Sequence, residues 1–535
     1  MHMHTNFMAK VADALEDNNA NISVTENGAL GYKHTDSKLV DMNFAIPQLR
    51  TFSDDLLISK WDELISSEEI SLVLRWLFFL RDVRYGVGER ETFRRLMKNL
   101  CNTRSEDAQR LIKAKVDEEY LIPFYGRWDD LLCLFNTYCR NAVAEVIHDQ
   151  LEKDLEGMKK HDSVSLLSKW MPSINTSSKE ARKFAWELAS YLDLTPRAYR
   201  KMLSALRKHL DVVERKMSGR KWDEINYEGV PSKANLIYSS AFLTHDAERR
   251  TEYLESLKKG EAKINSSVSF PHEIIHAVDM HPEQVDTYDA MWKSLPNLVD
   301  PNSRTMVVVD GSGSMCTNIP GSGCTAMEVS NAIGIYFAER LAGEFKNKFI
   351  TFGGRPQYVD FTGKKTILEK WRHAERFNDC SNTNIEAVFM MLLNTAKKYH
   401  MRQDEMPANL LFISDMEFDA GVDARPMDDT SRSLWSHYGS NASESLKKNR
   451  LMDNIDQRFR AAGYRIPRMI FWNVNSRTGT IPVTQNDLGV VLISGYSMQL
   501  AKMVMSANLD PYECLVEQLT TARYDPIKRI ADSIH

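Results

Sequence analysis

Hydrophobic positions follow two different periods along this chain, and the change of period divides it into two parts. From about residue 54 to about residue 257, apolar side chains recur three and four positions apart, which is the period of an α-helix. Thr195-Pro196 is a helix-start signal, because proline is well tolerated in a first helical turn. The clearest predicted helices cover residues 72–80, 141–158, 179–192 and 196–214. The short polar turns between them favour an all-α domain of successive helix pairs, as in HEAT-like helical repeats.

From Thr305 onward, short apolar runs alternate with longer amphipathic segments, as strands alternate with helices. The predicted strands are Met306–Val309, Phe349–Phe352, Leu410–Ile413, Met469–Trp472 and Val490–Ile493. The predicted helices are Met327–Phe345, Ile385–Tyr399, Ser445–Ala462 and Met498–Ser506. This alternation predicts a mostly parallel sheet with helices on both faces, that is, a doubly wound, Rossmann-like α/β fold.

A polar, proline-containing stretch before Thr305 indicates the boundary between the two parts. With 535 residues, the chain is long enough for each part to have its own core. We expect an N-terminal extension (1–50), a helical domain (51–278), a linker (279–304) and an α/β domain (305–535).

Composition and charge narrow the range of functions. The net charge is only -5, so binding to nucleic acid would need a local basic surface. No apolar run approaches the roughly 20 residues that span a bilayer, and Met1–Ala20 lacks the core of a signal peptide. The seven cysteines are scattered and form no CxxC pair, which favours a reducing, cytoplasmic setting.

Oxygen-bearing side chains gather where the first predicted strand ends. Val307–Val309 runs directly into Asp310-Gly311-Ser312-Gly313-Ser314. One carboxylate and two hydroxyls within five residues are hard ligands of the kind that Mg²⁺ prefers. In an open α/β sheet, ligands bind at the carboxyl ends of the strands. The strand 410–413 also ends in a carboxylate, Asp415, and the polar turn before the helix at Ile385 offers Thr383.

These three segments together resemble the von Willebrand factor A domain and its metal-ion-dependent adhesion site. The first motif matches in full, and the resemblance carries Thr383 and Asp415 over as further ligands. It implies that one coordination position is left for an acidic group of a partner, and it leaves Mn²⁺ and Ca²⁺ open beside Mg²⁺. The metal ligands implied by the resemblance are Asp310, Ser312, Ser314, Thr383 and Asp415.

Two other interpretations of this region compete with a magnesium site. The Asp310 motif is also compatible with a simple turn at a strand end, whereas a phosphate-binding loop is not favoured because GxxxxGK[ST] is absent. Cys316, Cys324 and Cys380 lie near the predicted site in the sequence, but soft thiolates do not suit Mg²⁺, so we expect no role for them there.

Short motifs in the helical half resemble the TROVE module of Ro ribonucleoproteins, in a divergent branch that carries a C-terminal A domain. The motifs are Arg81–Arg90, Ile122–Leu131, Lys169–Ser173, Tyr199–Arg207 and Val230–Lys233. The resemblance implies a ring of helical repeats closed by the A domain. It also implies binding of single-stranded RNA ends or small structured RNAs.

Basic residues in the helical half fit such binding, because phosphates need cations and unpaired bases stack on aromatic rings or guanidinium planes. Basic helix faces are more often simply solvated, and Arg127, in an aromatic turn beside Trp128, also fits a structural role. The candidate RNA-binding residues are Arg84, Arg90, Arg127, Arg200, Lys201, Arg207 and Lys208.

One enzymatic motif competes with this interpretation. His272-Glu273-Ile274-Ile275-His276 matches HExxH, which on a helix holds Zn²⁺ with the glutamate as general base of a metalloprotease. Pro271 and Pro282 keep any helix here short, and no third ligand has a convincing spacing, so the segment is better explained as a docking helix.

The sequence therefore favours a non-enzymatic RNA-binding scaffold with a Mg²⁺ site. The main alternative is a protein–protein adaptor that captures an acidic partner residue through the ion without binding RNA. A zinc protease is the third candidate.

Overall fold

The computed structural model describes residues 21–266, 268–420 and 451–533, which form parts of two compact units. The α/β unit comprises Met1–Phe52, Phe270–Val285 and Asn297–Gln518. The helical unit comprises Ser53–Ser269, Asp286–Pro296 and Leu519–His535. Both expected classes of fold are therefore present, but the division between them differs from the expected one at three places.

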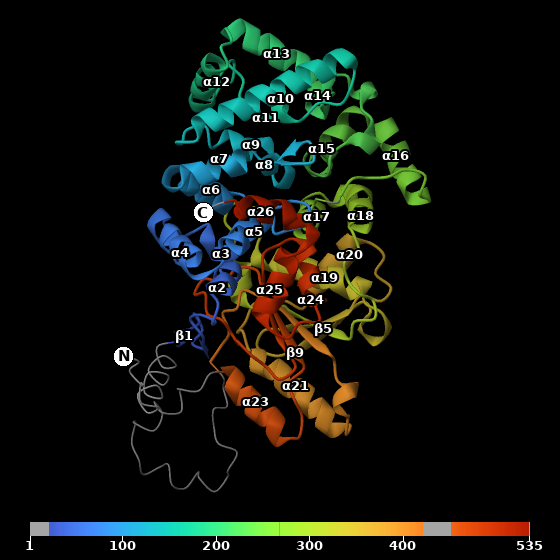
Figure 1. The fold of residues 1–535 in the computed structure, drawn as a ribbon. Coiled ribbons are helices and arrows are strands. Elements are labelled where there is room, and N and C mark those ends of the chain that lie inside the picture. Colours follow the sequence, from blue (N-terminus) through green and yellow to red (C-terminus); the bar gives the residue numbers. More distant parts are fainter. Residues whose placement is uncertain (1–20, 267, 421–450, 534–535) are drawn as a thin grey trace, which may run out of the picture. The chain divides into compact units, whose positions relative to one another are not determined.

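The α/β unit contains a six-stranded sheet (Figure 1). Its strands are β5 Thr305–Asp310, β6 Lys348–Phe352, β7 Gln357–Asp360, β8 Asn409–Ser414, β9 Arg468–Asn473 and β10 Val490–Ser494. The strand order is β10-β9-β8-β5-β6-β7, and every neighbouring pair is parallel except β6 and β7. The five predicted strands are confirmed, because strands of a parallel sheet covered by helices on both faces are largely buried and leave apolar runs in the sequence.

The sequence pattern did not predict β7. This strand is short, lies at the sheet edge and keeps Tyr358 57% exposed, so it has no continuous apolar run. Only Val359 of its four residues is buried, so β7 lacks the apolar run that marks the other five strands, including β10 at the opposite edge.

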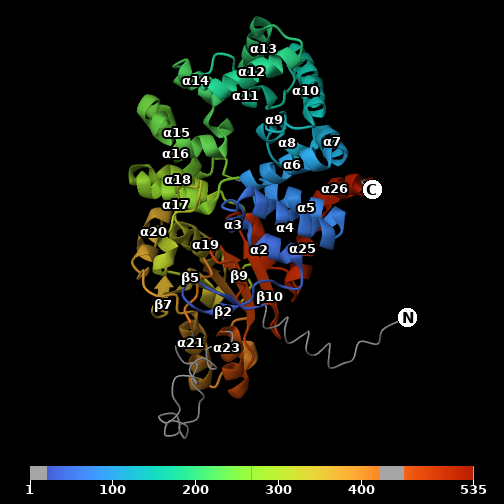
Figure 2. The same ribbon diagram turned by 90° about the vertical axis from the view of Figure 1, so that its left-hand side faces the viewer.

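Helices cover both faces of the sheet. On β9, Trp472 contacts Phe337 of α19 (Ala326–Arg340) with ring centroids 6.0 Å apart. The preceding Phe471 stacks on Phe412 of β8, which in turn contacts Phe389 of α21 (Ile385–Lys398). Because successive strand residues point to opposite faces, α19 lies on one face and α21 on the other. α21 lies beside α23 (Leu451–Ala461), as Figure 2 shows.

The sheet reverses its order between β5 and β8. From β5 the chain continues to β6 on one side, and it later returns to β8 on the other. Loops at such a switch point diverge and leave room for a ligand at the carboxyl ends of the two strands. Asp310 ends β5 and Asp415 follows β8, so the topology brings both expected carboxylates to this point.

Residues 21–52 belong to the α/β unit, so this part of the expected N-terminal extension (1–50) is not separate from it; residues 1–20 lie outside the described residues. Phe44, at the end of α2 (Lys38–Phe44), accepts hydrogen bonds through its carbonyl from Asn473 Nδ2 at 2.9 Å and Ser494 Oγ at 2.6 Å. α17 (Pro271–Met280) also belongs to this unit, where it packs on α19. The other described elements of the unit are β1 Ser23–Val24, β2 Leu30–Gly31, α3 Ile46–Leu49, α20 Ile367–Glu375, α24 Ala501–Val504 and α25 Pro511–Leu519.

The helical unit begins at Ser53 and also includes the end of the chain. Arg523 Nε donates to the buried carboxylate of Asp82 at 2.9 Å, and Tyr524 stacks on Tyr125 with ring centroids 5.7 Å apart. The expected α/β domain of residues 305–535 is therefore too long at its C-terminal end, because these contacts hold the last helix, α26 (Asp525–Ala531), on α5 (Ile70–Arg81).

The predicted helices of the helical unit are present, with one break. The expected helix 196–214 ends at His209, because Asp211 adopts a φ of 50° that an α-helix cannot contain, and α14 then begins at Val213. The helices are α4 Asp54–Ser67, α5, α6 Glu91–Thr103, α7 Ser105–Lys113, α8 Leu121–Tyr125, α9 Trp128–Leu132, α10 Arg140–Lys160, α11 Leu167–Trp170, α12 Lys179–Tyr191, α13 Pro196–His209, α14 Val213–Ser218, α15 Ser232–His245, α16 Ala247–Lys259, α18 Val285–Lys293 and α26. A small hairpin of β3 Lys115–Val116 and β4 Glu119–Tyr120 lies between α7 and α8.

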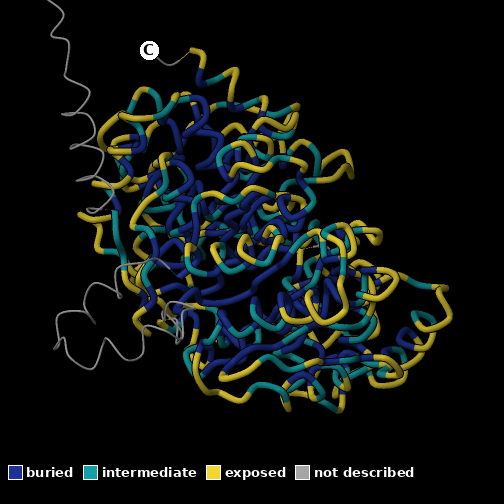
Figure 3. Tube along the Cα trace, turned by 90° about the horizontal axis from the view of Figure 1, so that it is seen from below, coloured by how far each residue is buried: buried dark blue, intermediate teal, exposed yellow. Residues whose placement is uncertain are grey.

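Burial follows the expected pattern in the described segments. Figure 3 shows buried stretches running through the interior and exposed residues along the surface turns. Within these segments, we find no helix that is both long enough and apolar enough to cross a bilayer. The predicted helix 445–462 is observed from Leu451 to Ala461, and its first six positions lie outside the described residues.

Candidate metal centre

The loop after β5 folds back on its own carboxylate. Ser312 N donates to Asp310 Oδ1 at 2.9 Å, and Ser414 Oγ donates to Asp310 Oδ2 at 2.5 Å. The hydroxyls of Ser312 and Ser314 lie 3.0 Å apart. Gly313 is required here because a Cβ would lie 2.9 Å from the carbonyl oxygen of Cys380. The first three predicted donors therefore converge at the end of β5, and Asp310 and Ser312 are fully buried.

A second loop, residues 378–384, lies across the first one. Cys380 N donates to the carbonyl of Gly311, and Gly313 N donates to the carbonyl of Ser381, both at 3.0 Å. These two backbone bonds bring the loop that carries Thr383, a residue only 1% exposed, against the β5 loop. Thr383 is thus held near the other donors by main-chain contacts that a sequence motif does not reveal.

Asp415, the fifth predicted donor, is fully buried after β8. Burial, and then the charge of Asp415, raise the pKa of Asp310 to about 7. Burial also raises the pKa of Asp415, whereas Arg477 and a hydrogen bond from Ser314 lower it. The two carboxylates are therefore close enough to repel each other, and Ser314 connects the first segment to the third.

The structure places three further polar residues around this centre. Arg477 Nη1 lies 3.1 Å from Asp415 Oδ2, so a guanidinium neutralises part of the negative charge. Glu417 is fully buried and accepts hydrogen bonds from the backbone N–H groups of Glu26 (2.8 Å), Arg477 (2.8 Å) and Thr478 (2.9 Å). Asn27 Nδ2 donates to Thr383 Oγ1 at 3.2 Å and to the carbonyl of Glu417 at 2.6 Å.

Little in the sequence indicates a role for Asn27, Arg477 or Glu417. Asn27-Gly28 is a turn signal and indeed joins β1 to β2. However, a turn signal does not say which part of the fold its hairpin will contact. Arg477 and Glu417 lie in irregular loops, where no periodicity marks a functional position.

Two cysteines lie at the edge of the same loops. The Sγ atoms of Cys316 and Cys380 are 3.5 Å apart, both residues are exposed, and neither is in a disulfide. Cys324 is buried at the other end of its loop. The thiols of Cys316 and Cys380 do not take part in the oxygen-donor set described above.

The candidate RNA-binding residues separate into inward-facing and outward-facing groups. Arg207 donates to the carbonyls of Ser168 (2.8 Å) and Met171 (2.7 Å) and to Ser173 Oγ (2.7 Å), so its guanidinium holds the loop after α11. Arg127 lies over the ring of Trp170, 4.5 Å from its centroid. These two arginines support the fold of the helical unit.

On α13, by contrast, Arg200, Lys201 and Lys208 are exposed, together with Arg197. Positions 197, 200, 201, 204 and 208 lie on one side of a helix, so the four cations form one stripe, which we call the α13 stripe. Among the described residues, none of the four is in an ion pair. Arg84 and Arg90 are also exposed, but Arg84 Nη1 donates to the carbonyl of Phe124 at 3.1 Å and Arg90 Nε bonds Glu91 at 3.0 Å.

The residues of the HExxH motif do not converge in the described structure. His272 is buried against the rings of Phe270 and Tyr496, with centroid distances of 5.5 and 5.6 Å. Glu273 accepts a hydrogen bond from the backbone N–H of Phe270 and so caps its own helix. His276 instead contacts Glu328 of α19, so the arrangement does not favour the zinc-protease interpretation.

Comparisons with known proteins match two domain models to different parts of the chain. The model of a domain of unknown function, DUF7788, matches residues 304–528, and that of another, DUF2828, matches residues 177–308. The chain is also similar to "Uncharacterized protein L728" of Acanthamoeba polyphaga mimivirus, at 27% identity over 547 residues, covering 95% of this chain and 89% of the viral protein. The DUF7788 match begins at β5 and spans all five predicted donors of the candidate metal centre.

Proposed function

We propose that this protein is a non-enzymatic binding scaffold related to the Ro and TROVE proteins, with a von Willebrand A-type domain that holds a divalent cation and captures an acidic ligand through it. The observation that carries the proposal is the convergence of oxygen donors from three separate segments at the switch point between β5 and β8. The proposed donors are Asp310, Ser312, Ser314, Thr383 and Asp415.

The chemistry of the donor set suits a hard cation. Two carboxylates and three hydroxyls match the oxygen ligands of Mg²⁺, with Mn²⁺ and Ca²⁺ as further candidates. A bound dication would supply the positive charge that Asp310 and Asp415 need when both are ionised at a buried site. It would also attract a carboxylate or phosphate of a ligand. Asn27 and Ser414 orient Thr383 and Asp310 through hydrogen bonds.

Cation binding can be tested with Mn²⁺, which is observed directly by electron paramagnetic resonance. We expect the full-length protein to bind Mn²⁺ and Mg²⁺ to compete with it. Asp310→Ala should abolish binding, and Thr383→Ala should weaken it. Ser381→Ala is a matched control, since it removes a hydroxyl from the same loop but not from the donor set. Equal binding by the wild type and Asp310→Ala would refute the site.

The α13 stripe favours RNA as a second ligand, bound by the helical unit. Four exposed cations lie along one side of a helix, where they can contact several phosphates, and each phosphate contact makes affinity salt-dependent. The double variant Arg200→Ala/Lys201→Ala should bind a single-stranded RNA oligonucleotide about tenfold more weakly. The slope of log affinity against log salt should fall by roughly one for each phosphate that the variant no longer neutralises.

The matched control is Lys397→Ala/Lys398→Ala, which removes the same charge from the exposed end of α21. Fluorescence anisotropy at several salt concentrations gives both quantities. Absent or salt-insensitive RNA binding by the wild type would refute the RNA proposal. If Mn²⁺ binding persisted in that case, the adaptor function would be favoured, in which the cation captures an acidic residue of a protein partner.

A further inference from the structure

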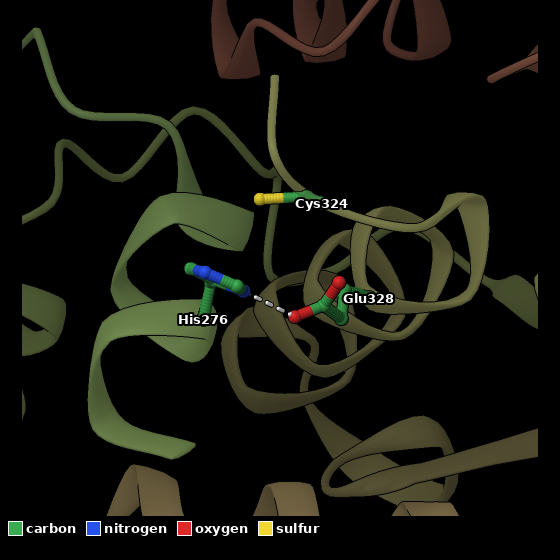
Figure 4. Close-up of side chains that lie close together, drawn as sticks. All are labelled: His276, Cys324 and Glu328. Atoms are coloured by element: carbon green, nitrogen blue, oxygen red, sulfur yellow. Dashed lines mark hydrogen bonds and ion pairs between the residues drawn. The ribbon is translucent and has the colours of Figure 1, made fainter. Parts of the chain in front are cut away.

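A second cluster of metal-ligating side chains lies where α17, the loop 317–325 and α19 meet (Figure 4). It consists of His276, Cys324 and Glu328. One ligand atom from each residue lies within 4.8 Å of the others, and His276 Nδ1 is 2.7 Å from Glu328 Oε1. None of these residues belongs to the oxygen-donor set after β5.

Each side chain is held in place by its own segment. Glu328 is the third residue of α19, and its Oε2 accepts hydrogen bonds from Thr325 N at 2.6 Å and Thr325 Oγ1 at 3.0 Å. This capping box fixes the carboxylate and directs Oε1 toward His276. Cys324 is only 2% exposed, and the backbone bond from Ile319 N to its carbonyl, at 2.8 Å, closes the loop that carries it.

The donor types differ from those of the first centre. Sulfur, imidazole nitrogen and one carboxylate oxygen form a ligand set for Zn²⁺, whereas Mg²⁺ would not favour the thiolate. The side chain of His276 is 40% exposed, so water has access to a fourth coordination position. Three protein ligands and one water give the tetrahedral arrangement that zinc adopts.

The charges around the cluster also favour a cation. The pKa of Glu375, on α20, is raised by burial and then by the negative charge of Asp279, and the charge of Glu328 adds to this effect, while Arg372 opposes it. Asp279 and Glu328, from two other helices, therefore both lie close enough to Glu375 to repel its carboxylate. A dication beside Glu328 would relieve that repulsion.

We propose that His276, Cys324 and Glu328 bind Zn²⁺. Binding requires neutral imidazole and ionised thiol, so the Cys324 thiol releases its proton when the metal binds. The metal joins the loop 317–325 to α17 and α19, and this loop directly follows the β5 loop of the candidate metal centre. Zinc thus fixes the loop 317–325 without contributing to the oxygen-donor set.

The test uses the full-length protein with Co²⁺ as a spectroscopic substitute for Zn²⁺. We expect one equivalent of Co²⁺ to give a thiolate-to-cobalt charge-transfer band that Zn²⁺ abolishes. Cys324→Ser should remove the band, and His276→Gln should weaken Zn²⁺ binding by more than about 100-fold, the upper limit for loss of an outer-shell partner. Substitution of the buried Cys324 could disturb folding, so the partly exposed His276 provides a second variant. Circular dichroism checks that both variants fold.

Two controls separate this site from others. Cys316→Ser removes an exposed thiol and His281→Ala an exposed imidazole at the end of α17, and both should leave the band unchanged. Asp310→Ala should also retain it, so failure of the first metal centre does not affect this result. The absence of a band in the wild type, or its persistence in Cys324→Ser, would overturn the proposal.

Discussion

Arg477 places a positive charge beside the candidate metal centre, and Arg477→Met tests whether that charge substitutes in part for a bound cation. Asp415 is fully buried, and the guanidinium, 29% exposed, lies 3.1 Å from its carboxylate. Two charges with centres about 4 Å apart attract by about 4 kcal/mol at an effective dielectric constant of about 20. Solvent screening of the partly exposed guanidinium reduces this to about 2 kcal/mol.

We therefore expect Arg477→Met to lower the free energy of unfolding of the metal-free α/β unit by about 2 kcal/mol. This corresponds to a few degrees in Tm for a unit of this size. The variant also lacks a cation that repels Mg²⁺, so saturating Mg²⁺ should raise its Tm more than that of the wild type.

Differential scanning calorimetry with EDTA and with Mg²⁺ measures both effects. Arg460→Met is a matched control, because Arg460 forms its ion pairs with Asp456 and Asp487 at an exposed site, where solvent screens them, and its loss should leave the Tm nearly unchanged. If Arg477→Met had the same metal-free Tm and the same Mg²⁺ response as the wild type, the guanidinium would not be acting as a partial substitute for the cation.

Three further predictions concern the protonation of Asp310, the helical unit and the packing of α19. The pKa of Asp310 is raised from its ordinary value of 3.8 to about 7 in the folded protein without metal. Between these two pH values the folded protein keeps the proton that the unfolded chain loses. The contribution of Asp310 to the free energy of unfolding therefore falls as the pH rises from about 4 to about 7. Since Mg²⁺ needs the ionised carboxylate, calorimetry should show a larger Mg²⁺-induced rise in Tm at pH 8 than at pH 6. Arg207→Ala should destabilise the helical unit by about 2 kcal/mol or more in denaturant unfolding because three hydrogen bonds are removed, whereas Lys208→Ala should change it by less than about 0.5 kcal/mol. Gly334→Ala should destabilise the α/β unit by about 1–3 kcal/mol, because the new Cβ would lie 2.5 Å from Val309 Cγ2, and an unchanged Tm would contradict this close approach.

The predictable parts of the fold are those in which the burial of a position determines whether its residue is apolar or polar. Val307–Val309 and Leu410–Ile413 are buried on both faces of the sheet, so nearly every position must be apolar. Asp310 and Asp415 are charged residues at the ends of such apolar runs. The sequence therefore marks them as candidates for a chemical role.

The parts that could not be predicted depend on contacts between distant segments. The separation of Arg207 from Arg200 is one example: both are basic residues on α13, but only Arg207 reaches the carbonyls after α11. Arg200 and Arg207 are about two turns apart, so helical spacing places them on the same side of α13. It does not show which of them packs against another segment of the chain. In the HExxH motif, similarly, the spacing indicates a shared helix face, whereas the structure directs His272 to aromatic rings and His276 to α19.

The candidate metal centre also depends on a segment that is distant in the sequence, the N-terminal hairpin of β1 and β2. Asn27 donates to Thr383 Oγ1, and because a hydroxyl oxygen has two lone pairs, one remains for a cation. Glu417 fixes this hairpin by accepting from Glu26 N, and it fixes the loop of Arg477 by the same means. The donors themselves lie within residues 304–528, the range matched by DUF7788, but the residue that orients Thr383 lies outside that range. The candidate centre is therefore a property of the whole α/β unit, in which the loops beside the sheet carry the proposed donors and the distant hairpin restricts the orientation of Thr383.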